Sequence, residues 1–135
     1  MSKHIVRLNP ENLPDAGKIG YSQISIITPR KTAFISGQVA IPANGEPVPT
    51  CIVRQVEIAG ENVKSALHSI GATVNDVIQV RLYVVDLTPE RLDLIMPAFL
   101  AIFDGVQPSL TGIGISALAS PEFQVEIELT AQVPD

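Results

Sequence analysis

The sequence predicts a single α+β domain in which two helices cover one face of a six-stranded sheet. Segments with alternating apolar and polar residues occur towards both ends of the chain, and two stretches with helical spacing lie between strand-like segments. The 135 residues suit one domain with its own core, so we expect a single domain over residues 1–135. The expected order, β-β-β-α-β-α-β-β, makes each helix a connection between strands and leaves the other sheet face open.

The first third of the chain predicts three strands. Residues 5–8 form a short apolar segment, and the prolines that follow it predict a loop because proline has no backbone donor. Residues 21–28 alternate, residues 29–31 form a turn, and residues 32–38 run back, so we expect a hairpin. The proline-rich and glycine-rich segment after residue 38 predicts a further loop.

Two amphipathic helices are expected in the middle of the chain. Apolar residues recur with three-and-four spacing from residue 52 to residue 70, and Gly71 can end this helix in a left-handed cap. Gly60 is small where the helix would cross the sheet, which permits close packing. The second helix should begin with Thr88 as N-cap and Pro89 in the first turn, and we expect a kink at Pro97.

The remaining strands should supply most of the core. Residues 76–86 predict a strand, and residues 111–117 and 123–132 predict a second hairpin. The residues expected to face the helices are Ile78, Val80, Leu82 and Val84 in the first strand, Thr111, Ile113, Ile115 and Ala117 in the second, and Val125, Ile127, Leu129 and Ala131 in the third. Gly112 and Gly114 would then lie on the open face with Arg81 and Tyr83.

Composition excludes several classes of function. The net charge is −5 and no cluster of lysine and arginine occurs, so nucleic acid is not an expected partner. Cys51 is the only cysteine, and no signal-like apolar run follows the start, so we expect a cytoplasmic protein. No apolar run reaches the roughly 18 residues needed to cross a bilayer, so no membrane partner is expected. His, Cys and carboxylate residues show no metal-ligand spacing, and no glycine-rich phosphate loop occurs, so we expect neither a metal nor a cofactor.

Four motifs in order along the chain carry more information. They are Ile19-Gly20-Tyr21-Ser22-Gln23, Ile35-Ser36-Gly37-Gln38, Val84-Val85-Asp86-Leu87, and Gln107-Pro108-Ser109-Leu110-Thr111 followed by Val125-Glu126-Ile127-Glu128. With these motifs nearly the whole chain resembles the YjgF/RidA family of small trimeric proteins, whose best-known members hydrolyse enamine and imine intermediates. The resemblance implies a YjgF-like fold of the chorismate-mutase-like type, with a mixed six-stranded sheet. It also implies a homotrimer whose open sheet faces point inward.

The resemblance also implies where the sites lie. Each would occupy a cleft between neighbouring subunits, lined by Tyr21, by the backbone of Ser36 and Gly37, and by Glu126, which would position the hydrolytic water. Pro108 and Thr111 flank the position where the family has an arginine that binds the substrate carboxylate through two parallel hydrogen bonds. Here that position is Leu110, and Gly112 stands where a cysteine is often found.

The missing arginine is the central departure from the family. Leucine donates no hydrogen bond, so a carboxylate substrate would lose an interaction of about 1.5–3 kcal/mol. Deamination of amino-acid-derived imines is therefore not expected unless another cation, such as Arg81, compensates. An interfacial ion pair between Arg81 and Glu126 or Glu128 is the simpler interpretation of Arg81. Glu126 could also be an ordinary solvated residue, and Tyr21 an aromatic residue at the edge of the core.

Three functions remain as hypotheses. The leading one is a homotrimer that hydrolyses a reactive small metabolite without the usual carboxylate, or with the carboxylate placed elsewhere. The alternative is a non-catalytic protein that binds a small molecule, in which Leu110 lines the pocket. An activity as endoribonuclease or translation inhibitor is less favoured because the chain is acidic. The sequence leaves the identity of the substrate open.

Overall fold

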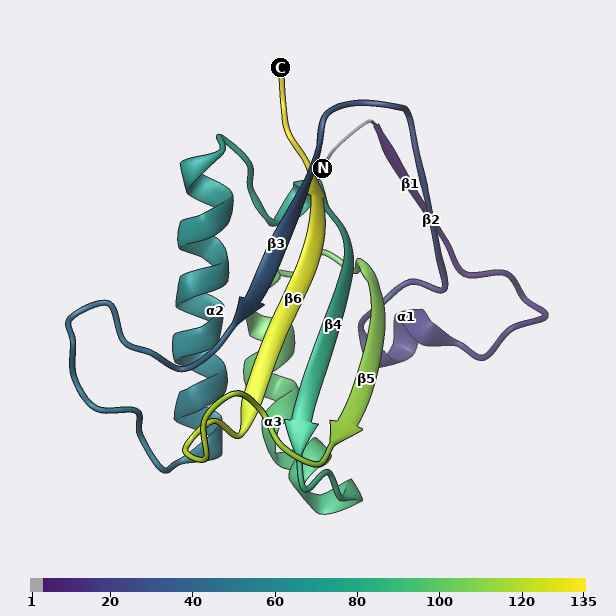
Figure 1. The fold of residues 1–135 in the computed structure, drawn as a ribbon. Helices are drawn as coiled ribbons and strands as arrows, with labels where there is room; N and C mark the ends of the chain where they lie inside the picture. Colours follow the sequence, from purple (N-terminus) through teal and green to yellow (C-terminus); the bar gives the residue numbers. More distant parts are fainter. Residues whose placement is uncertain (1–3) are drawn as a thin grey trace.

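The computed structural model describes residues 4–135 of the chain (Figure 1). Its elements follow the expected order, with a four-residue helix and a 3-10 helix in addition. They are β1 (Ile5–Leu8), α1 (Ala16–Ile19), β2 (Ile24–Ile27), β3 (Thr32–Gln38), α2 (Ile52–Ser69), η1 (Val74–Asp76), β4 (Val77–Val85), α3 (Pro89–Ala101), β5 (Ser109–Ile115) and β6 (Val125–Gln132).

The larger sheet is mixed, which confirms the predicted α+β class, but the strands form a four-stranded and a two-stranded sheet and not the single six-stranded sheet that was predicted. The four-stranded part has the order β3-β6-β4-β5, in which β4 and β5 are parallel and the other pairs are antiparallel. Strands β1 and β2 form a separate antiparallel pair, and one parallel bridge between Ser22 and Ser109 joins the segment before β2 to β5. Helices α2 and α3 lie together on one side of the four-stranded part (Figure 1).

Both predicted hairpins are wrong. Strand β2 pairs with β1 and not with β3, whose partner is the last strand, β6. Strand β6 also pairs with β4, while β5 lies on the other side of β4. Two alternating segments joined by a short turn favour a hairpin when only local sequence signals are considered. The structure instead forms pairs between segments far apart in the sequence, in which each central strand is bonded on both edges.

The predicted helix ends are confirmed. Gly71 has φ 72°, and the Ala72 N–H donates to the Leu67 carbonyl across the end of α2. The Arg91 N–H donates to Thr88 Oγ1 at the start of α3, and the helix continues through Pro97. Gly60 does permit close packing, but its neighbour is Ile102 just after α3 and not the sheet.

The core lies between the helices and the four-stranded sheet. All four β6 residues predicted to face the helices are at most 3% exposed. In β4 a register shift between Val77 and Gln79 turns Val77 into the core, while Ile78 is only half-buried. The prediction for Ile78 is therefore wrong, because a bulge breaks the alternation at that end of the strand. The remaining predicted core residues of β4, which are Val80, Leu82 and Val84, are each 1% exposed.

The predicted orientation of β5 is also wrong. Register pairs Leu110 with Val80 and Gly112 with Leu82, and paired residues share one face of a sheet. Leu110 therefore faces the helices, where it packs against the core. Thr111 lies beside Arg81 and Ile113 beside Tyr83, on the open face. The alternation of β5 is weak because it contains two glycines, so its orientation is set by its pairing with β4.

Candidate ligand-binding site

The first group of predicted site residues lies on the open face, where β3 meets β6. The β3 register shifts between Ile35 and Gln38, so Ser36 and Gly37 form a bulge opposite β6. The Glu126 side chain lies against this bulge, because a methyl group added at Gly37 would be 2.4 Å from Glu126 Cδ. Only glycine leaves room for the carboxylate here. The structure therefore brings Gly37 and Glu126 together within one chain, with Ser36 beside them.

The Glu126 carboxylate is half-buried, and no hydrogen bond or ion pair joins it to another residue in the described part of the chain. The open-face partner of Glu126 in β4 is Tyr83. A carboxylate that is held in place by packing, and not by a counter-ion, is available to accept a proton or a hydrogen bond from a water molecule.

The second group lies around the start of β5. The Ser22 N–H donates to the Pro108 carbonyl at 3.1 Å, and Ser22 Oγ donates to the Gln107 carbonyl at 2.6 Å. These bonds hold the segment that carries Tyr21 against the segment that leads into Leu110. Tyr21, Pro108 and Leu110 form an apolar cluster that encloses no space for a water molecule; its other members are Gly20, Val80, Phe99, Leu100 and Phe103.

The two groups lie on opposite faces of the sheet. Leu110 is paired with the buried Val80, whereas Glu126 is paired with Tyr83, three residues further along β4, and side chains alternate along a strand. Thr111 joins neither group and lies exposed beside Arg81. A single chain therefore does not bring Glu126 and Tyr21 into one pocket.

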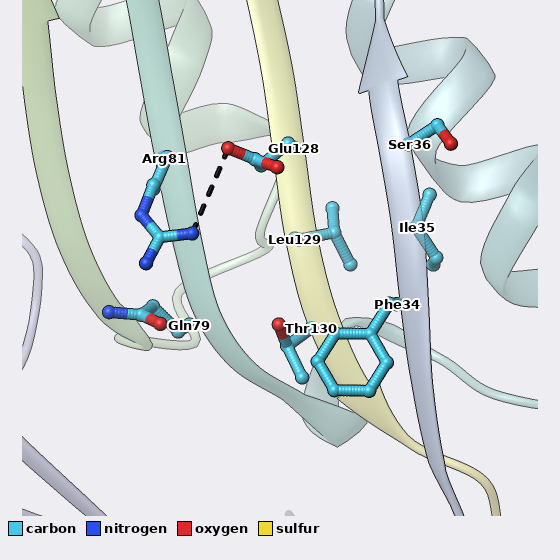
Figure 2. A pocket seen from close by; sticks show the side chains of 8 residues that line it. All are labelled: Phe34, Ile35, Ser36, Gln79, Arg81, Glu128, Leu129 and Thr130. Carbon is cyan, nitrogen blue, oxygen red and sulfur yellow. Dashed lines mark ion pairs between the residues drawn. The ribbon is translucent and has the colours of Figure 1, made fainter.

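A hollow of about 310 Å³ opens on the face that carries Glu126. Figure 2 shows the Arg81 and Glu128 side chains, which both line the hollow, turned toward each other; Arg81 Nη1 is 3.7 Å from Glu128 Oε1. Phe34 stands at its rim and is 83% exposed. Arg81 pairs with Glu128 within one chain, which is one of its two predicted partners, and the location of this pair at a subunit interface stays a prediction. The cation that could have replaced the missing arginine is thus already matched by a carboxylate.

Tyr83 shares the Glu128 carboxylate with Arg81. Its hydroxyl donates a hydrogen bond to Glu128 Oε1. This hydrogen bond, with smaller contributions from lost hydration and from the charge of Glu128, raises the pKa of Tyr83 above its ordinary value, while Arg81 acts in the opposite direction. Tyr83 is therefore a neutral donor at neutral pH.

Sequence reasoning missed the contacts of Tyr83 and Glu128 and the role of Leu100. Alternation did place Tyr83 and Glu128 on one face, but β4 and β6 are separated by some forty residues, and no local signal fixes their register. Leu100 lies on the predicted apolar side of α3, and only the tertiary structure places it against Gly20 and Leu110.

Within residues 4–135, no group of three or more His, Cys, Asp and Glu side chains is arranged to hold a metal ion. The described helices include none that is long and apolar enough to cross a membrane. Cys51 is exposed immediately before α2.

Comparison with known proteins agrees with this architecture. The sequence profile of the family described as Endoribonuclease L-PSP matches residues 13–133. The RutC family protein YjgH of Escherichia coli is 34% identical over 104 residues, which cover 76% of each chain. The structure of YyfB from Yersinia pestis, a protein of unknown function in the conserved Rid family, is 36% identical with a TM-score of 0.89, covering 96% of this chain and 98% of YyfB. RidA from an Antarctic Psychrobacter is 25% identical with a TM-score of 0.69, covering 84% and 88% of the two chains.

The fold is that of a small α+β protein in which two helices cover one face of a mixed sheet. The profile match and the relatives make the family explicit: the chain belongs to the YjgF/RidA family, also called the Rid or endoribonuclease L-PSP family. The resemblance inferred from the four motifs is thereby confirmed.

Proposed function

We propose that the chain, as a single domain, forms a homotrimer with three clefts between subunits, and that it hydrolyses a reactive small metabolite there. The observation that carries this proposal is the separation of the two groups of site residues. Glu126 and Gly37 lie on one face of the sheet, and Tyr21, Pro108 and Leu110 lie on the other. A cleft that uses both groups has to take one group from each of two neighbouring copies.

The open face supports association of copies. It exposes the large apolar side chain of Phe34 on β3 and carries the partly buried Tyr83 and Ile113 on β4 and β5, and apolar surface on an uncovered sheet face is stabilised by burial against another chain. Covering this face in a trimer would also remove water from the Arg81–Glu128 pair. The proposed trimer therefore explains why one face of the sheet is left without helices.

In the proposed reaction Glu126 positions a water molecule for attack on the carbon of a carbon–nitrogen double bond. The water oxygen becomes a carbonyl oxygen, the carbon–nitrogen bond breaks, and the nitrogen leaves as ammonia after accepting protons from the water. Glu126 carries a proton between these atoms. The Gly37 backbone borders the carboxylate and limits where the water can lie.

Leu110 sets the expected substrate class. It lies among Tyr21, Leu100 and Pro108 in a cluster with no charged side chain, so this side of the cleft offers apolar contact and no partner for a carboxylate. The same observation favours a second candidate, a non-catalytic member that binds an apolar or weakly polar metabolite. An endoribonuclease activity, which the family description names, has less support because the chain carries a net charge of −5.

Hydrolysis of freshly generated 2-iminopropionate and 2-iminobutyrate tests the proposal. We expect little turnover by the natural protein. We also expect none from Leu110→Arg alone, because its side chain has no space beside Leu100. The double variant Leu100→Ala with Leu110→Arg makes that space and should gain turnover, whereas Leu100→Ala alone is the matched control. Rapid turnover by the natural protein would show that a cation elsewhere in the protein binds the substrate carboxylate.

Glu126→Gln separates the two leading functions. The substitution keeps the shape of the side chain and removes the base. If the protein is a hydrolase, its rate of hydrolysis should therefore fall about 100-fold or more. If the variant hydrolyses every tested imine as fast as the natural protein, the role given to Glu126 is wrong. If neither protein hydrolyses any tested imine, the binding function takes the place of the hydrolase.

A further inference from the structure

A second pocket lies between β1, η1 and the segment that follows α3, and it borders the Tyr21 and Pro108 group through Ser22 and Gln107. It has a volume of about 400 Å³ and is lined by Arg7, Asn9, Ser22 and Asn75 on one side and by residues 104–107 on the other. This volume lies within the range of about 300–1,000 Å³ that is typical of small-molecule sites. No step of the proposed hydrolysis uses these side chains.

Arg7 is the cation of this pocket, and its charge is not matched. Its Nη2 donates to the Asn75 backbone carbonyl at 3.2 Å, but Nη1 is buried without a hydrogen-bond partner among the described residues. The described chain gives Arg7 no carboxylate within ion-pair distance. The guanidinium is partly removed from water, and this burial lowers the pKa of Arg7. An anion would offset this cost.

The carboxylate that lines the pocket is already paired. The Asp104 oxygens lie 3.2 and 3.4 Å from Lys64 Nζ on α2, so Lys64 balances the charge of Asp104. The net charge of the pocket is therefore that of Arg7.

Asn9 adds a second donor. Its Oδ1 accepts from the Gln23 N–H at 2.9 Å, which fixes the amide so that Nδ2 is the group without a partner in the described chain. By contrast, Ser22 Oγ donates to the Gln107 carbonyl and Gln107 Nε2 donates to the Gly17 carbonyl. Arg7 and Asn9 are thus the side chains left to bind a ligand.

We propose that this pocket binds a small metabolite through a carboxylate or phosphate group, with Arg7 supplying the charge and Asn9 a hydrogen bond. A guanidinium and an amide N–H are the donors that oxyanions prefer in proteins. The pocket has room for more than a bare ion, so the ligand carries an uncharged part beside Asn75 and Val106. The proposal does not depend on the hydrolytic cleft or on the trimer.

The test is a titration of the full chain with sodium phosphate and with sodium acetate. Chemical shifts of the backbone amide signals in NMR report binding, and sodium chloride at equal ionic strength is the control. We expect saturable shifts at Arg7, Asn9, Asn75 and Gly105 with at least one of the two anions, and the anion that binds more tightly identifies the group. Equal, non-saturating shifts in chloride would mean that only ionic strength acts, which would overturn the proposal.

Three variants complete the test. Arg7→Gln should weaken binding about tenfold or more, whereas Arg54→Gln, which removes an exposed arginine paired with Glu57 and Glu61 on α2, should leave it unchanged. Asn9→Asp keeps the oxygen that accepts from Gln23 and replaces the donor with a negative oxygen, so it should also weaken binding about tenfold, even if Arg7→Gln fails to fold. Unchanged affinity in Asn9→Asp, or in a folded Arg7→Gln, would refute the site.

Discussion

Gly37→Ala tests the geometry of the proposed catalytic carboxylate without removing it. The added methyl group would lie 2.4 Å from Glu126 Cδ, 2.6 Å from Cγ and 2.7 Å from Oε1. These distances are shorter than any contact between a methyl carbon and a non-bonded heavy atom. The Gly37 φ angle is not in the left-handed region, so alanine causes no backbone strain there. The substitution therefore acts by displacing the Glu126 side chain.

The expected cost in stability is small. Glu126 is half-buried and has no hydrogen bond in the described chain that must break, so it can rotate away at a cost of roughly 0.5–1.5 kcal/mol. Replacing a strand glycine by alanine contributes roughly 0.5–1 kcal/mol in the opposite direction. The two effects nearly cancel, and the free energy of unfolding should change by less than about 1 kcal/mol.

The expected cost in function is large. A displaced carboxylate no longer positions water, so turnover of any imine that the natural protein hydrolyses should fall about 100-fold or more, as in Glu126→Gln. Urea unfolding and initial rates measure the two quantities. Gly112→Ala is the matched control for stability, because a methyl group added there has no neighbour within 4 Å. Natural turnover in Gly37→Ala would refute the role given to Glu126.

Three further predictions concern other parts of the fold. Gln55 is fully buried and bonds to the Pro49 and Glu122 carbonyls and the Gln124 N–H, so Gln55→Leu should lower the free energy of unfolding in urea by about 3–5 kcal/mol; a loss below about 1 kcal/mol would contradict this. Gly60→Ala places a methyl group 2.5 Å from Ile102 Cγ1, so the melting temperature should fall although alanine favours helix; an increase would show that α2 and α3 separate easily. The raised pKa of Tyr83 stabilises the fold below the ordinary tyrosine pKa of about 10, and this contribution is lost as pH rises through the higher folded value. The melting-temperature difference between the natural protein and Tyr83→Phe should therefore shrink above about pH 10, and a constant difference would contradict the hydrogen bond to Glu128.

The elements of the fold were predictable because their signals are local. Thr88 and Gly71 mark helix ends through hydrogen bonds within a few residues, and the alternation of β6 marks its buried face. Strand pairing was not predictable, because the partners of β3 and β5 lie far along the chain and nothing local distinguishes them from the nearer segments. The predicted orientation of β5 was wrong for the same reason.

The candidate site was predictable only in part. Gly37 and Glu126 do meet, and the contact depends on the missing side chain of glycine. The packing of Leu110 against Leu100 and the sharing of Glu128 between Arg81 and Tyr83 depend on tertiary contacts, which a linear pattern does not contain. Leu110 was predicted to line a pocket, whereas in one chain it is part of a closed apolar cluster.

The central claim is that the site exists only between copies of the chain. The molar mass in solution, measured by light scattering during size-exclusion chromatography, tests it most directly. We predict about 43 kDa, three times the 14.4 kDa of the chain. A stable species at 14.4 kDa at micromolar concentration would contradict the claim, because one copy holds Glu126 and Tyr21 on opposite faces of its sheet.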